Sequence, residues 1–143
     1  MQVNIQLLRN GQMPTYATQH SAGMDLSAAI DQDIILNPGQ YQLIPCGFAM
    51  ALPAGYEAQI RPRSGLAIKH GITVLNAPGT IDADYRGEVG AILINGGDNE
   101  FTVTPHMRIA QMVIASYQHV TCLTVDTLDT TKRGVRGFGS TGV

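Results

Sequence analysis

The sequence has few cysteines and lacks the usual metal-binding spacings. Of its 143 residues only Cys46 and Cys122 are cysteines. Two are too few for the disulfide scaffold of a small secreted domain, so both are expected to be buried thiols. The four histidines, at positions 20, 70, 106 and 119, form no HExxH or CxxC-type zinc signature. The sequence therefore argues against a zinc site and against a disulfide-rich fold.

Long hydrophobic runs and an excess of basic residues are also lacking. No run reaches the about eighteen apolar residues of a membrane span, and the N-terminus lacks the basic and apolar regions of a secretory signal. We therefore expect a cytoplasmic protein that does not bind membranes. The formal net charge of −2 disfavours a general nucleic-acid binder. Eight of the nine Lys and Arg residues nevertheless lie between Arg61 and Arg136, which favours a small anionic ligand.

The sequence does contain many short apolar segments, some with a period of two. At 44% hydrophobic and 14% charged residues, the chain can bury the core of one domain. Turn-forming segments rich in Asn, Pro and Gly separate the apolar ones, which lie at residues 3–7, 34–36, 41–52, 89–94, 101–103, 109–115 and 120–125. Short strands at this spacing predict an all-β sandwich or barrel.

One short helix is expected to follow residue 64. Ser64 is a good N-cap, and Gly71 suits the position just after the last helical turn. Arg61 and Arg63 lie just upstream. The free N–H groups at the helix start therefore form either an anion site or an ordinary loop-to-helix turn with solvated arginines.

Three further segments hold side chains that could carry chemistry. Asp82 and Asp84 lie between glycines; in a hairpin they would share one side and one could act as a general base, unless the segment is a solvated turn. Asp25 lies among small residues, where it either faces a hydrated metal ion or caps a turn. Arg108 and Gln111 interrupt a buried strand, so they are either internal struts or ligand contacts.

Residues 133–142 cannot build a hydrophobic core, because they hold four glycines, two arginines, one Phe and a Ser-Thr pair. Glycine lets the backbone approach a ligand closely, and Arg and hydroxyl groups suit phosphate oxygens. Phe138 offers a flat face to a base or a sugar. The alternative is a disordered polar terminus.

Taken in order, these segments resemble the five motifs of the trimeric dUTP pyrophosphatases (dUTPases). The matching stretches are residues 22–26, 61–71, 76–87, 108–111 and 133–142. The resemblance implies that residues 1–131 form an all-β, jelly-roll-like β-barrel with one short helix. Residues 132–143 would form a flexible, glycine-rich C-terminal arm. It also implies a homotrimer with shared active sites. One subunit would supply the first, second and fourth motifs, a second subunit the third, and the third subunit the arm.

The resemblance further implies Mg²⁺-dependent hydrolysis of dUTP to dUMP and pyrophosphate, which limits uracil in DNA and supplies dUMP for thymidylate synthesis. Asp82 would be the catalytic base that activates water for attack on the α-phosphorus. Tyr85 would lie under the deoxyribose and leave no room for a ribose 2′-hydroxyl. The expected uracil and deoxyribose contacts are Asn76, Gly79, Thr80, Ile81, Tyr85 and Phe138. The expected phosphate contacts are Arg63, Ser64, Gly65, Gln111, Arg133, Gly139, Ser140 and Thr141. Asp25 would hold Mg²⁺ through water, and Arg108 would be an internal strut.

One departure and two alternatives remain. Val135-Arg136 stands where small residues, often glycine, are common in the family, so Arg136 either adds a phosphate contact or hinders closure of the arm. The dCTP deaminases share this fold, but residues 81–87 and the arm resemble the hydrolases. A nucleotide-gated regulatory protein on the same fold is the alternative from another class.

Overall fold

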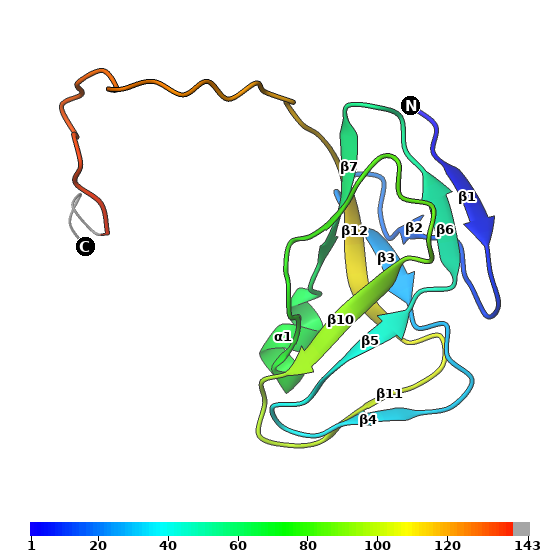
Figure 1. The fold of residues 1–143 in the computed structure, drawn as a ribbon. Coiled ribbons are helices and arrows are strands. Elements are labelled where there is room, and N and C mark those ends of the chain that lie inside the picture. Colours follow the sequence, from blue (N-terminus) through cyan, green and yellow to red (C-terminus); the bar gives the residue numbers. More distant parts are fainter. Residues whose placement is uncertain (139–143) are drawn as a thin grey trace.

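The computed structural model describes residues 1–138, which form a β-rich body and an extended C-terminal segment (Figure 1). The body holds a single helix, α1 (Ser64–His70). Its strands are β1 (Asn4–Leu7), β2 (Thr15–Tyr16), β3 (Met24–Ser27), β4 (Ile34–Leu36), β5 (Tyr41–Pro45), β6 (Phe48–Ala51), β7 (Tyr56–Arg61), β8 (Ile72–Val74), β9 (Gly79–Ile81), β10 (Gly90–Asn95), β11 (Phe101–Val103) and β12 (Arg108–Ser116). The predicted all-β class with one short helix is confirmed.

All the strand pairs are antiparallel, and most join strands that are distant in sequence. The largest sheet has the order β2-β3-β12-β7-β9, and a smaller one has the order β5-β10-β8. Two further pairs, β1-β6 and β4-β11, complete the body. In Figure 1, β5 and β10 cross in front of β3 and β12. This arrangement is a jelly-roll-like body, as predicted.

The core lies between these sheets and follows the two-residue period of the strands. In β10 the side chains of Ala91 and Leu93 point inward and are fully buried, while Ile92 and Ile94 are only partly buried. Successive side chains of a strand point to opposite faces, so alternation in the sequence becomes one buried face. The largest fully buried apolar side chains are Phe48, Leu26, Leu36, Ile44, Ile72, Leu93, Ile109 and Met112.

Asn95, at the end of β10, is a buried polar residue with a full set of partners. Its side-chain amide donates to the carbonyl oxygens of Leu36 and Asn99, both at 2.8 Å, and its oxygen accepts from the N–H of Gly97 at 2.9 Å. A buried amide without partners would be costly, and here each bond is made to the main chain. Asn95 thereby fixes the turn after β10 against β4.

Two predicted elements near the site differ from the structure. The apolar segment 41–52 forms two strands, β5 and β6, because the chain turns at Gly47, which has φ of +73°. Residues 79–87 form no hairpin. Strand β9 ends at Ile81 and pairs with β7, and Asp82 then begins a turn closed by a hydrogen bond from the N–H of Tyr85 to the Asp82 carbonyl at 3.2 Å.

Helix α1 begins one residue earlier than predicted. The carbonyl of Arg63 accepts hydrogen bonds from Leu66 and Ala67, both at 3.1 Å, which makes Arg63 the N-cap and Ser64 the first helical residue. No side chain caps the helix start. The predicted end of the helix is confirmed, because Gly71 follows the last helical residue in a left-handed conformation with φ of +68°.

Residues 117–138 leave the body after β12 and form no strand, contrary to the prediction for 120–125. Figure 1 shows this segment extending well away from the body. Val120 is 70% exposed and Leu123 is 81% exposed, because no other part of the described chain lies against them. Cys122 is exposed, so its predicted burial is wrong, whereas Cys46 is buried as predicted. Nowhere in residues 1–138 is there a helix with the length and apolar character needed to cross a bilayer.

Candidate active site

The predicted site residues of the body gather in two separate pockets. The first has a volume of about 250 Å³ and lies beside β9; we name it the β9 pocket. The predicted residues that line it are Asn76, Gly79, Thr80, Ile81, Asp82 and Tyr85. The second, of about 330 Å³, is named the arginine pocket. The predicted residues that line it are Asp25, Arg63, Ser64, Gly65 and Gln111.

The β9 pocket has one wall of regular strand and one of irregular chain. Gly79 and Thr80 are held in register by β7, opposite Ile60 and Gln59. Across the pocket Tyr85 is about half exposed, and its hydroxyl donates to the Glu88 carbonyl at 3.1 Å. The pocket thus combines strand backbone, an amide side chain, a carboxylate and an aromatic ring.

The turn that carries Asp82 and Tyr85 is fixed to the body by Glu88 and Val89. A Glu88 carboxylate oxygen accepts from the N–H of Gly47 at 3.0 Å. The N–H of Val89 donates to the Phe48 carbonyl at 2.8 Å, and the Val89 carbonyl accepts from the main-chain N–H of Cys46 at 2.9 Å. These bonds anchor an otherwise irregular segment, so the side chains of the turn occupy defined positions.

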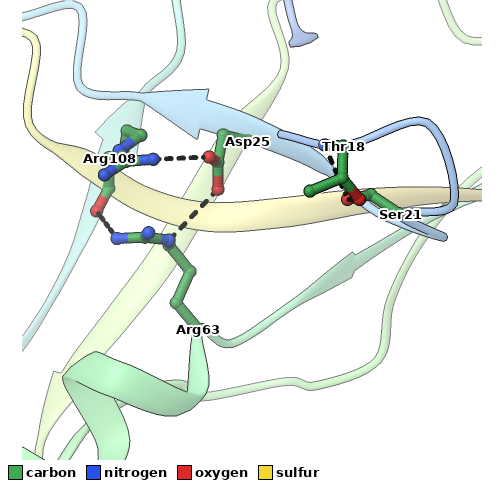
Figure 2. Close-up of polar contacts among 5 residues, drawn as sticks. All are labelled: Thr18, Ser21, Asp25, Arg63 and Arg108. Carbon is green, nitrogen blue, oxygen red and sulfur yellow. Dashed lines mark hydrogen bonds and ion pairs between the residues drawn. The ribbon is translucent and has the colours of Figure 1, made fainter. Parts of the chain in front are cut away.

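The arginine pocket is organised by an ion network at Asp25 (Figure 2). Arg63 Nε donates to one Asp25 oxygen at 3.1 Å, and Arg108 Nη1 donates to the other at 3.0 Å. Arg63 also donates to the Arg108 main-chain carbonyl at 3.1 Å. Two guanidinium groups and one carboxylate leave an excess of one positive charge, which suits an anion.

The strands determine which groups enter the arginine pocket. Asp25 on β3 is paired directly with Gln111 on β12, and the register of that pair shifts between Arg108 and Ala110. A bulge of this kind re-aims side chains. Gln111 lies across from Arg61 on β7 and donates from its amide to the Pro62 carbonyl at 2.9 Å.

One arginine differs from the expectation, and another resolves an open alternative. Arg108 is not an internal strut, because its side chain is 58% exposed and lines the arginine pocket. Arg108 is the first residue of β12, at the solvent-exposed end of the strand. The apolar residues that follow it in the sequence predicted a buried strand and therefore did not indicate this exposure. Of the two arginines upstream of α1, Arg63 lines the pocket, whereas Arg61 lies outside it and donates from Nε to the Gln59 side-chain oxygen at 3.1 Å.

Other lining residues carried no signal in the sequence. Leu43 and Ile92, from β5 and β10, form an apolar wall of the β9 pocket, and Ser21 lines the arginine pocket. Figure 2 shows Ser21 beside Thr18, whose N–H donates to the Ser21 hydroxyl oxygen at 3.1 Å. Their positions follow from the pairing of distant strands, which a single sequence does not reveal.

Of the predicted arm residues, Arg133 and Phe138 are described by the structure, and neither lines either pocket. Arg133 Nε donates to the Arg136 carbonyl at 2.9 Å, and Arg136 Nε donates to the Arg133 carbonyl at 3.1 Å, so the two arginines form a local turn. The Phe138 side chain is fully exposed. The predicted phosphate contacts Gly139, Ser140 and Thr141 lie outside the described residues.

Cys46 lies close to the site but is no nucleophile. Burial, with the nearby Glu88 carboxylate as a lesser cause, raises the pKa of the Cys46 thiol to about 12. The thiol is therefore protonated at neutral pH. Among residues 1–138, no three His, Cys, Asp or Glu side chains cluster closely enough to hold a metal ion by themselves.

Comparison with known proteins agrees with this geometry. The sequence model of the dUTPase family matches residues 9–142. The deoxyuridine 5′-triphosphate nucleotidohydrolase of Rickettsia felis is 60% identical over 144 residues, covering 99% of this chain and 97% of that protein. The protein of the same name from Rickettsia prowazekii is 58% identical over 145 residues, covering 100% of this chain and 98% of that protein.

Solved structures show the same fold. The dUTPase of Staphylococcus bacteriophage 80alpha, solved with dUPNHPP, superposes with a TM-score of 0.91 at 25% identity and covers 99% of both chains. The D95N variant of the dUTPase from phage phi11 of S. aureus, described with a structural Mg(II) ion, has a TM-score of 0.82 at 21% identity. It covers 91% of this chain and 100% of that one. The two pockets, the family match and the full-length relatives together place this chain in the dUTPase family, as a dUTP nucleotidohydrolase.

Proposed function

We propose that the chain hydrolyses dUTP to dUMP and pyrophosphate by attack of water on the α-phosphorus, at active sites shared within a homotrimer. The supporting observation is the division of the site: the β9 pocket and the arginine pocket share no lining residue. A nucleoside triphosphate needs both a nucleoside pocket and a phosphate pocket. Two copies of the chain would join the β9 pocket of one to the arginine pocket of the other.

The C-terminal segment supports the proposal that a third subunit contributes its arm to each active site. Within the described chain, all hydrogen bonds of residues 118–138 are internal to that segment, whereas Tyr117 still donates to the Gly55 carbonyl of the body at 3.1 Å. Exposed apolar side chains along it, such as Leu123, favour docking on another subunit. The boundary between body and arm, near residue 131, stays a prediction.

In the β9 pocket, Asn76 and the main chain of β9 would read the uracil edge, and Tyr85 would lie under the deoxyribose. Asp82 would orient the attacking water and take its proton. Phe138 of an arm would close over the base, and such stacking contributes about 1–3 kcal/mol.

In the arginine pocket, the phosphates would be held by groups that already converge there. Arg63 and Gln111 would bind phosphate oxygens, together with the N–H groups of Ser64 and Gly65. From the arm, the contacts would come from Arg133, Gly139, Ser140 and Thr141. Phosphoryl transfer depends mainly on position and electrostatics, so many modest contacts suit the reaction.

Mg²⁺ dependence is part of this proposal. Each Asp25 oxygen already accepts one guanidinium bond and retains a further lone pair, so Asp25 fits a metal-bound water rather than the ion itself. Mg²⁺ prefers oxygen ligands and keeps several waters when it binds phosphates. When bound, the ion would offset the charge that develops on the triphosphate. The reaction would limit uracil in DNA and supply dUMP for thymidylate synthesis.

The test is release of pyrophosphate from dUTP, dTTP, dCTP and UTP, with Mg²⁺ and with EDTA. Mg²⁺-dependent release from dUTP alone supports substrate, reaction and cofactor together. Ammonia release from dCTP would show a deaminase instead. Tight dUTP binding without turnover would favour a nucleotide-gated regulator. Release from all four nucleotides would remove the roles given to Asn76 and Tyr85.

A further inference from the structure

The ring of Tyr85 lies back over the main chain of Gly87. The Tyr85 hydroxyl bonds to the Glu88 carbonyl at 3.1 Å, so the side chain spans the residues that follow it. A Cβ atom placed on Gly87 would lie 2.3 Å from Oη, 2.5 Å from Cζ and 2.9 Å from Cε2 of Tyr85. All three distances are far inside van der Waals contact, and all involve the same rigid aromatic group.

The requirement for glycine at position 87 is steric rather than conformational. Gly87 is not among the glycines with positive φ, so alanine fits the backbone there. The three atoms nearest to such a Cβ all belong to the Tyr85 side chain.

The main chain around Gly87 has little freedom to move instead of the ring. Arg86 Nη1 donates to the carbonyls of Ala83 and Tyr85 at 2.7 and 2.8 Å. On the other side, Glu88 bonds to the N–H of Gly47, and Val89 bonds to β6. A side chain at position 87 would therefore displace the Tyr85 ring and break its bond to Glu88.

We propose that Gly87 is a positioning residue that sets sugar selectivity: its missing side chain provides the space in which the Tyr85 ring is held at the β9 pocket. The inference rests on the proposed function, in which this ring excludes the ribose 2′-hydroxyl. Gly87 itself touches no substrate. A displaced ring neither supports the deoxyribose nor defines the space denied to a 2′-hydroxyl.

The experiment compares kcat/KM for dUTP and for UTP in Gly87→Ala, Tyr85→Ala and the unaltered protein. For Gly87→Ala we expect the ratio of dUTP to UTP to fall about tenfold or more, since shape alone rejects an added hydroxyl by only about a hundredfold. The loss should come mainly from dUTP. An unchanged ratio in a folded Gly87→Ala protein overturns the inference, provided that Tyr85→Ala lowers it.

Gly23→Ala is the matched control in the arginine pocket. A Cβ at Gly23 would lie 2.4 Å from Oε1 of Gln111, so this substitution displaces a proposed phosphate contact. dUTP and UTP carry the same triphosphate, so both should lose kcat/KM equally and the ratio should stay constant. A ratio that falls as far in Gly23→Ala as in Gly87→Ala would mean general disruption, and would overturn the specific role of Gly87.

The double variant Tyr85→Ala/Gly87→Ala covers the case in which Gly87→Ala does not fold. Removal of the ring removes the three closest contacts of a Cβ at position 87, so the double variant should fold and match the selectivity of Tyr85→Ala. A double variant that also fails to fold shows that Gly87 serves something other than Tyr85, against the inference. If Tyr85→Ala keeps the full dUTP preference, the proposed role of Tyr85 fails instead, and the two failures are distinguished.

Discussion

The body and the C-terminal segment contain similar apolar side chains but bury them to opposite extents. In β10, Leu93 is completely buried, whereas Leu123 and Leu128 in the segment are 81% and 83% exposed. The two cysteines divide in the same way, with Cys46 buried and Cys122 exposed. Alternation of apolar residues favours a strand, but burial needs an opposing surface. The body supplies that surface to itself, and in the proposed trimer another subunit would supply it to the segment.

The largest expected effect separates chemistry from binding within the body. Asp82→Asn should lower kcat by about 10²–10⁴-fold, the usual contribution of a general base, while dUTP binding stays close to normal. Single-turnover kinetics and calorimetry with a non-hydrolysable analogue measure the two quantities. Asp84→Asn is the matched control, because Asp84 lies two residues away but does not line the β9 pocket. Near-normal turnover in a folded Asp82→Asn protein would remove Asp82 as the base.

Removal of the arm tests the role of the C-terminal segment. A chain truncated after Thr131 should keep its folded body, because residues 132–138 make no hydrogen bond to it, and we expect it to keep the proposed trimer as well. Its kcat/KM should fall at least about tenfold, since base stacking alone is worth about 1–3 kcal/mol. Light scattering reports the trimer and pyrophosphate release reports activity. Unchanged kinetic constants would contradict a closing arm.

The sequence predicted the body better than the geometry of its sites. The period of two gave the β class, and Gly71 marked the helix end, because both depend on neighbouring residues. Arg108 is exposed at the start of β12, beside a register shift against β3, and the walls at Leu43 and Ile92 depend on pairing of distant strands. For 120–125 the local pattern favoured a strand, but the described chain offers no partner. Tertiary pairing decided each of these differences.

A smaller effect is expected from substitution of Arg63, one of the two arginines that precede α1 in the sequence. Arg63→Ala should raise KM for dUTP about tenfold, because a hydrogen bond to a charged group contributes about 1.5–3 kcal/mol. Arg61→Ala is the control, since Arg61 bonds to Gln59 and lies outside the arginine pocket. Steady-state kinetics of both variants measure the difference. Equal effects of the two substitutions on KM would contradict a specific role of Arg63 in binding the phosphates.

The last expected effect is on stability and concerns the two cysteines at alkaline pH. The pKa of Cys46 is raised by burial from 9.0 to about 12, so the folded protein holds the thiol proton at a pH where the unfolded chain has lost it. Stability from this group is fully present below pH 9 and declines as pH rises from about 9 to 12, by up to about 1.4 kcal/mol per pH unit. Urea unfolding across this range, under reducing conditions, measures the slope. Cys46→Ala should have the shallower slope, whereas Cys122→Ala, altered in the exposed segment, should match the unaltered protein. An identical slope in all three would show that Cys46 is not held protonated by the core.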